Sequence, residues 1–166
     1  TLERARSVTT IHALQSEYSL WSRRVEEDIL YYCRDYGIAL VAYSPVGRGF
    51  LAGGVRKMIH LSERDIRHGM PRFQGNAFQN NLRVLEQVEL LGLRWGMTLA
   101  QVCLNWLWSR GEHVGAIPGT SNLSHWRDDK GATSPLSEDQ VTELEELFQN
   151  YRFEGERYAP AKLALE

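Results

Sequence analysis

The sequence has few of the residues and patterns that mark metal-binding, disulfide-linked or membrane proteins. Its two cysteines, Cys33 and Cys103, form no CxxC pair and have no histidine at the spacing of a shared metal ligand. We therefore expect no metal site, and two thiols buried in the core of a cytoplasmic protein. The apolar runs are far shorter than the roughly 18 residues of a membrane-spanning helix, and no signal peptide is recognisable.

Clusters of one charge are missing too. The 19 basic and 21 acidic residues give a formal net charge of −2, and the basic ones are scattered along the chain. A surface that binds nucleic acid or an anionic membrane needs concentrated positive charge. The sequence therefore predicts no nucleic acid and no membrane among its partners.

The 166 residues contain short apolar runs that alternate with helical patterns. Strands are predicted near 13–17, over 38–43 and over 113–119, because these runs are short and end at turn residues. Residues 44–76 form a connection too long to be idle in a compact domain. The alternation predicts an α/β protein with parallel strands and right-handed crossovers.

Helices are predicted between and after these strands. Apolar residues recur at helical spacing over 25–36 and 82–88. Three further helices are predicted from residues suited to their first positions, including one capping box: Thr98, Asn122, and Ser137 with Gln140. Because a closed (β/α)₈ barrel needs roughly 200 residues or more, three strands indicate a piece of a larger unit.

The ends of the predicted strands carry residues suited to a nucleotide. Gln15 near the end of the first strand has an amide that can pair with another amide. Tyr43 ends the second strand with a flat ring, and glycines follow whose backbone can approach a pyrophosphate. Residues 119–122 open a helix, whose N-terminus attracts phosphate. Taken singly, a structural glutamine, a core tyrosine with a flexible loop, and a plain N-cap remain open alternatives.

Four segments in this order resemble the aldo-keto reductase family, in its NADP-dependent reductase branch: LQSEYSLWSR, GIALVAYSPVGRGFLAGG, PRFQGNAFQNNL and AIPGTSNLSHWRDD. The similarity runs from residue 1 to about 159. It implies a (β/α)₈ TIM barrel that binds NADP(H) in an extended form. Residues 1–166 would be the C-terminal half of an incomplete barrel, from about the sixth strand onward. Residues 44–76 would be its cofactor and substrate loop, and residues 151–166 its tail.

The resemblance also implies a cofactor site. Gln15 would bind the nicotinamide carboxamide, and Tyr43 would stack on the nicotinamide ring. The pyrophosphate would follow the second strand end, the 2′-phosphate would lie at the third, and adenine would lie beyond it. The residues implied for these three places are Ser44, Val46, Gly47 and Arg48; Gly119, Thr120, Ser121 and Asn122; and Asp128 and Asp129.

One departure concerns the choice between NADP and NAD. Relatives usually carry arginine in the phosphate turn and about four residues beyond it, where this chain has Ser121, Asn122 and His125. Arg127 or a protonated His125 would compensate. Without a guanidinium, the pocket loses the charge pairing that selects the 2′-phosphate, so NAD remains an alternative.

A second departure concerns catalysis. Members of the family use an Asp, Tyr, Lys and His set that precedes the sixth strand, and none of this chain's lysines lies at a predicted strand end beside a tyrosine. We therefore expect no catalytic residue here, only cofactor contacts and pocket walls from Trp21, Phe50, Phe73 and Tyr158. The isolated chain would be inactive, and its partner would be a missing N-terminal half-barrel or a second copy of itself.

The resemblance favours an NADP-dependent oxidoreductase that reduces a small aldehyde or ketone by hydride transfer. Two alternatives stay open. One is a non-catalytic binding or regulatory protein of the same fold, and the other is an inactive truncated product.

Overall fold

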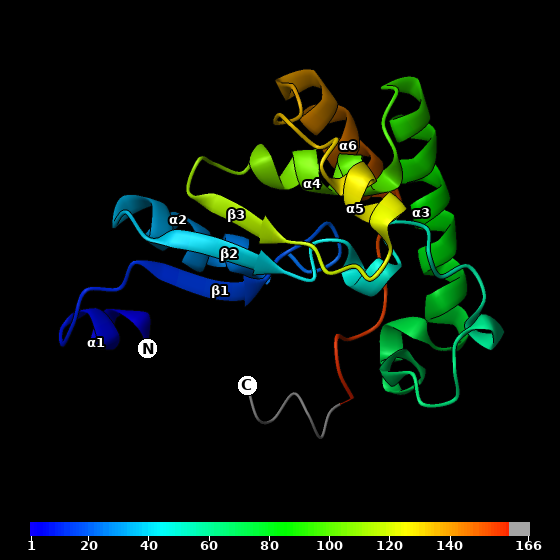
Figure 1. Ribbon diagram of the computed structural model, residues 1–166, viewed down its shortest axis with the longest axis horizontal. Coiled ribbons are helices and arrows are strands. Elements are labelled where there is room, and N and C mark those ends of the chain that lie inside the picture. The colour runs from blue at the N-terminus through cyan, green and yellow to red at the C-terminus, as the bar shows by residue number, and fades with distance from the viewer. Residues whose placement is uncertain (160–166) are drawn as a thin grey trace.

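A small parallel sheet forms the centre of the computed structural model, which describes residues 1–159 (Figure 1). The sheet contains β1 (Ala13–Glu17), β2 (Ala39–Tyr43) and β3 (Val114–Ile117), in that order. All pairings are parallel, with Leu40 opposite both Leu14 and Val114. The three predicted strands are confirmed. The predicted tail beyond residue 159 lies outside the described residues.

The two faces of the sheet differ in burial. Leu40, Ala42 and Val114 are buried on the face that helices cover. On the other face Gln15 is exposed and Tyr43 is half-buried. This alternation follows from the two-residue period of a strand, so one face of the sheet belongs to the core and the other is partly accessible at Gln15 and Tyr43.

Helices pack against the sheet and against one another. Helix α2 packs against β2 and α4 against β3, while α3 contacts both α4 and α6. The capping boxes at Thr98 and at Ser137 are both formed. The helices are α1 (Leu2–Arg6), α2 (Ile29–Asp35), α3 (Gly75–Arg94), α4 (Leu99–Trp108), α5 (Leu123–Asp129) and α6 (Glu138–Asn150).

The prediction of a single helix over 25–36 is wrong at its N-terminal end. The chain forms a 3₁₀ turn, η1 (Arg24–Glu27), and α2 begins only after Asp28, whose φ of −153° is not helical. The turn is fixed because the Glu26 carboxylate accepts hydrogen bonds from Tyr18 (2.7 Å) and from Arg23. An apolar periodicity does not report such an anchored carboxylate.

The long connection over 44–76 contains four short 3₁₀ turns, which are η2 (Gly47–Gly49), η3 (Met58–His60), η4 (Ile66–Gly69) and η5 (Pro71–Phe73). Phe50 and Phe73 from this connection are 0% and 2% exposed. Their rings pack edge to face, with centroids 5.8 Å apart. They therefore belong to the core, and the expectation that they form pocket walls is wrong.

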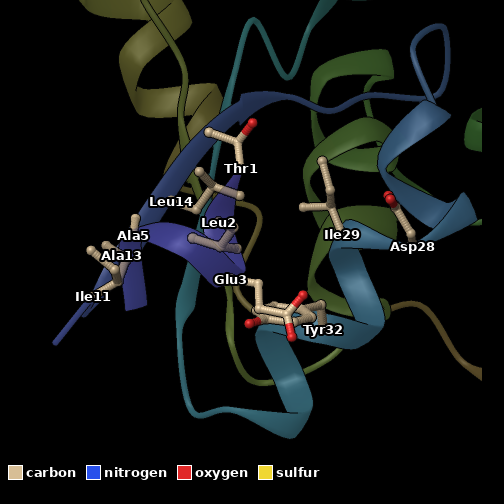
Figure 2. Close-up of a pocket in the computed structure, with 10 residues that line it drawn as sticks. All are labelled: Thr1, Leu2, Glu3, Ala5, Ile11, Ala13, Leu14, Asp28, Ile29 and Tyr32. Atoms are coloured by element: carbon tan, nitrogen blue, oxygen red, sulfur yellow. The ribbon is translucent and has the colours of Figure 1, made fainter. Parts of the chain in front are cut away.

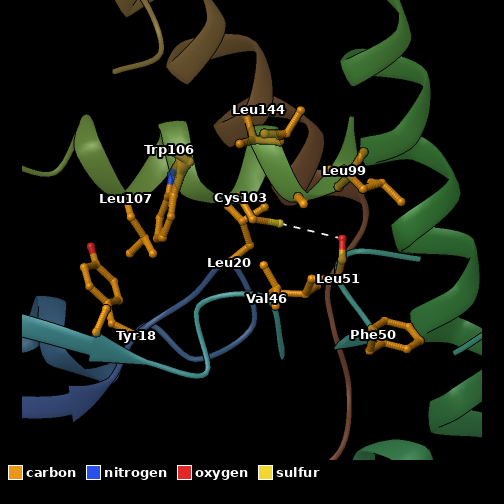
Figure 3. Close-up of a cluster of buried hydrophobic side chains, with 14 of the residues drawn as sticks. Tyr18, Leu20, Val46, Phe50, Leu51, Leu99, Cys103, Trp106, Leu107 and Leu144 are labelled. Carbon is orange, nitrogen blue, oxygen red and sulfur yellow. Dashed lines mark hydrogen bonds between the residues drawn. The ribbon is translucent and has the colours of Figure 1, made fainter. Parts of the chain in front are cut away.

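The core continues from Phe50 to α4 (Figure 3). Cys103 is buried there, and its Sγ lies 3.8 Å from the carbonyl oxygen of Leu51. Burial raises the pKa of the Cys103 thiol to about 12. Cys33 is buried as well, so the prediction of two core thiols is confirmed. Within residues 1–159, no helix has the length and apolar character to cross a membrane.

Trp106 connects the core to a charged network. Its ring is fully buried and meets Tyr18 edge to face at 5.3 Å. The guanidinium carbons of Arg23 and Arg110 lie 5.1 and 5.3 Å from the ring centroid. Arg23 also donates to Glu145 of α6 at 2.7 Å, so this network ties the loop after β1 to the last helix.

Candidate functional site

The three strands end at the same edge of the sheet, because all of them are parallel (Figure 1). Gln15 pairs with Val41, two residues before Tyr43, so the Gln15 and Tyr43 side chains lie on one face. Both line a cavity of about 740 Å³. The sequence predicted that these two residues share an edge, and the structure brings them into one cavity.

The glycine-rich turn after β2 has an unusual backbone. Ser44 and Arg48 have φ values of 50° and 56°, although neither is a glycine. The N–H groups of Gly47 and Gly49 donate to the carbonyls of Ser44 (2.9 Å) and Val46 (3.0 Å). These two N–H groups therefore close the turn itself. Val46 and Gly47 are buried, and Ser44 and Arg48 remain partly accessible.

The Arg48 side chain reaches the C-terminal segment. Its guanidinium donates to the Tyr158 hydroxyl at 2.9 Å. The backbone carbonyl of Arg48 also has a partner, since Arg67 Nη1 donates to it at 2.8 Å. Arg48 thus contacts two segments that the sequence did not connect to it.

The turn after β3 is exposed and locally bonded. Thr120 Oγ1 accepts from the Asn122 N–H at 3.1 Å, and Asn122 Oδ1 accepts from the Ser124 N–H at 2.8 Å. Gly119, Ser121 and the capped start of α5 lie in the same stretch. Asn122 therefore begins the helix that the sequence predicted there.

The acidic residues of α5 have different environments. Asp128 accepts hydrogen bonds from Thr98 Oγ1 at 2.9 and 3.0 Å and from Gln101, so it fastens α5 to the start of α4. Burial raises the pKa of the Asp129 carboxyl, and the neighbouring Asp128 adds to this. His125 is exposed on the same helix. Contacts of Asp128 and Asp129 with adenine, and of His125 with the 2′-phosphate, stay predictions.

A buried ionic cluster beside Gln15 was missed by the sequence reasoning. Glu17 Oε1 accepts from Ser22 Oγ at 2.6 Å and lies 3.4 Å from Arg72 Nη1, while Glu17 Oε2 lies 3.5 Å from Arg157 Nε. The Glu17 and Arg72 side chains are 3% and 8% exposed. A glutamate at the end of an apolar strand was the only signal for this cluster.

One amide fastens the C-terminal segment beside this cluster. Asn81 Nδ2 donates to the carbonyls of Arg72 and Glu154, both at 2.9 Å. Its Oδ1 accepts from the Glu154 N–H at 2.7 Å. Arg157, which lies in the same C-terminal segment as Glu154, lines the 740 Å³ cavity together with Trp21. The segment around Glu154 therefore forms one of its walls.

Asp65 makes part of the stability depend on pH. Its carboxylate accepts from Arg67 Nε (2.8 Å), Nη2 (2.7 Å) and the Arg67 backbone N–H (3.0 Å). These bonds lower the pKa of Asp65 to about 2. An unfolded aspartate titrates near about 4. Because the folded pKa is the lower one, this contribution to stability is complete above about pH 4 and is lost as the pH falls toward 2.

We predict that Asp65→Asn removes this component. The difference in unfolding free energy between wild type and Asp65→Asn should be largest above about pH 5 and should shrink below about pH 3. Urea denaturation at a series of pH values measures it. A difference that stays constant down to pH 2 would contradict the assignment.

A second cavity of about 740 Å³ lies along the outer edge of the sheet (Figure 2). It is more apolar and contains neither Gln15 nor Tyr43. Its walls come from α1, the first half of β1 and the start of α2, and include Leu2, Ile11, Leu14, Ile29 and Tyr32. Among residues 1–159, no group of His, Cys, Asp and Glu side chains is arranged to hold a metal ion.

Comparisons with known proteins identify the family. The family model described as "Aldo/keto reductase family" matches residues 1–149. The chain therefore belongs to the aldo/keto reductase family.

Solved structures agree in fold. The glycerol dehydrogenase AKR11B4 from Gluconobacter oxydans has a TM-score of 0.84 and 21% identity, over 96% of this chain and 48% of its own. The thermostable aldo-keto reductase Tm1743, solved with the inhibitor epalrestat, has a TM-score of 0.60 and 30% identity, over 88% and 44%. An aldo-keto reductase from Klebsiella pneumoniae, solved with NADPH, has a TM-score of 0.60 and 21% identity, over 94% and 47%. The chain spans about half the length of these structures.

Proposed function

We propose that this chain is the cofactor-binding part of a cytoplasmic, NADP-dependent oxidoreductase that reduces small aldehydes or ketones. In this proposal its strands are the sixth to eighth of a (β/α)₈ barrel. Its family supports an oxidoreductase. The observation that carries the assignment to this part of the chain is the shared cavity of Gln15 and Tyr43 at the carboxyl edge of a parallel sheet.

The residues present fit a dinucleotide in their donor chemistry. At the end of β2, Arg48 offers a cation and Ser44 a hydroxyl, which suit a diphosphate. The N–H groups of Gly47 and Gly49 close the turn, so the phosphate contacts fall mainly to these side chains. Beyond β3, Thr120 and Ser121 add exposed hydroxyls.

The chain's own residues would bind and orient the cofactor. Tyr43 would cover one face of the nicotinamide, and Gln15 would hold its carboxamide in the plane of the ring. When bound, NADPH supplies the hydride for carbonyl reduction. Fixing the ring against Tyr43 would leave its other face for the substrate, which is how these residues would contribute to the rate.

The reaction also needs a proton donor, which we propose comes from outside this chain. The described lysines Lys57 and Lys130 lie in the long connection and just after α5, not at the ends of strands. The Asp, Tyr, Lys and His set would then come from an N-terminal half-barrel. A second copy of the chain is the alternative partner, and it would not supply this set.

A preference for NADP is part of the proposal. A reductase of known structure with the same fold is solved with NADPH. In this chain Arg127, or His125 in its protonated form, would meet a 2′-phosphate, and both residues are exposed on α5.

The test is the affinity for NADPH. In the protein that carries this chain, Tyr43→Ala should weaken NADPH binding by about 1–3 kcal/mol, or roughly 5- to 150-fold in Kd, because stacking on the ring is lost. Titration of NADPH fluorescence measures Kd. Tyr31→Ala is the matched control, since Tyr31 is 49% exposed on α2 and is not among the residues of the cavity. Equal losses in both variants would refute the stacking role.

A further inference from the structure

A segment of the long connection supports the turn after β2 by a hydrogen bond. Arg67, in η4, lies 19 positions after Arg48, and its Nη1 donates to the Arg48 carbonyl at 2.8 Å. The same nitrogen is 3.8 Å from where a Cβ on Gly49 would lie. The guanidinium therefore fits closely against the turn.

Asp65 fixes the direction of this guanidinium. It accepts from Arg67 Nε and Nη2 in a two-pronged ion pair, at 2.8 and 2.7 Å. The Arg67 and Asp65 side chains are 20% and 19% exposed. A planar fork bound on one edge by a carboxylate has its remaining nitrogen set in direction, so Nη1 points at one acceptor.

That acceptor belongs to a residue in an unfavourable conformation. Arg48 has φ 56° and ψ 37°, the left-handed region that residues with a Cβ avoid. Such a conformation persists only when its surroundings hold it. A charge-assisted hydrogen bond to the carbonyl of Arg48 helps to hold its backbone. This backbone, together with the hydrogen bond to the Tyr158 hydroxyl, sets the direction of the Arg48 side chain.

We propose that Arg67, locked by Asp65, is a positioning residue for cofactor binding, and that it acts by aiming Arg48 at the pyrophosphate. This inference rests on the proposed function, in which Arg48 contacts that diphosphate. In this proposal Arg67 itself would make no contact with the cofactor. Because Arg67 keeps the turn ordered before the dinucleotide binds, less conformational entropy is lost on binding. The affinity for the dinucleotide is therefore higher than with a loose turn.

The test uses NADPH titrations of the protein that carries this chain. Arg67→Ala should weaken NADPH binding about tenfold, and Arg67→Lys, which keeps one donor but not the fork, about threefold. Arg64→Ala is the matched control, since Arg64 is an exposed arginine of the same connection. It should leave Kd unchanged.

A double-mutant cycle separates positioning from simple loosening of the fold. If Arg67 acts through Arg48, the double variant Arg48→Ala/Arg67→Ala should bind NADPH about as weakly as Arg48→Ala alone. Losses that add, or an Arg67→Ala variant with wild-type affinity, would overturn the inference and leave the proposed function standing. Wild-type protein that binds no NADPH would overturn both. Should Arg67→Ala fail to fold, Asp65→Asn replaces it in the cycle.

Discussion

Replacing Glu17 by alanine should lower the free energy of unfolding by about 3–5 kcal/mol, the usual cost of removing one partner from a buried ion pair. The Glu17 and Arg72 side chains are 3% and 8% exposed, and Arg157 approaches the same carboxylate. Burial lowers the pKa of the Arg72 guanidinium, and the Glu17 carboxylate acts against this. Without Glu17, Arg72 would remain charged and buried beside a second cation.

Urea denaturation of the protein that carries this chain measures this effect. The control is Glu89→Ala, because Glu89 pairs with Arg56 at 2.8 Å but is 42% exposed. An exposed pair contributes about 0–1 kcal/mol. If Glu17→Ala costs no more than Glu89→Ala, the cluster beside Gln15 does not stabilise the fold as argued.

A second large effect is expected at Gly47. Its φ is +56°, and an added Cβ would lie 2.8 Å from Leu51 Cγ and 3.1 Å from Trp21 Cε3. Leu51 is fully buried, so it has little space to move. We expect Gly47→Ala to cost about 1–2 kcal/mol for the left-handed backbone. Overpacking should add about 1–3 kcal/mol.

Gly37→Ala separates these two contributions. Gly37 has a similar φ of +65°, but a Cβ there would meet no atom within 4 Å. It should therefore show the backbone cost alone. The two variants are compared by urea denaturation, and equal losses would show that the space around Gly47 adapts. The affinity for NADPH, measured alongside, should fall in Gly47→Ala and stay unchanged in Gly37→Ala.

Much of the fold could be predicted because its strands and helix starts depend on residues that are close together in the sequence. The strands appear as short apolar runs, and the capping boxes at Thr98 and Ser137 involve residues three positions apart. Such features depend on neighbours in sequence. The break at Asp28 was missed because Tyr18 and Arg23 anchor Glu26 through polar contacts, which hydrophobic periodicity does not register.

The sequence predicted that Gln15 and Tyr43 lie at one edge of the sheet, but not the contacts that surround them. Parallel strands place Gln15 and Tyr43 at one edge, so their proximity follows from topology. The contact between Glu17 and Arg72 spans 55 positions, and that between Arg48 and Tyr158 spans 110. No spacing rule connects residues so far apart. The burial of Phe50 was missed because Phe50 belongs to a loop, and residues of a loop are usually exposed.

The contacts of the Asn81 amide determine when the cavity can be completed during synthesis. It binds Arg72, nine positions before it, and Glu154, 73 positions after it. A chain that leaves the ribosome from its N-terminus presents β1, β2 and α3 long before Glu154 emerges. The edge that carries Gln15 and Tyr43 is therefore formed before the wall around Glu154, and a nascent chain stalled before residue 154 should present that edge without it.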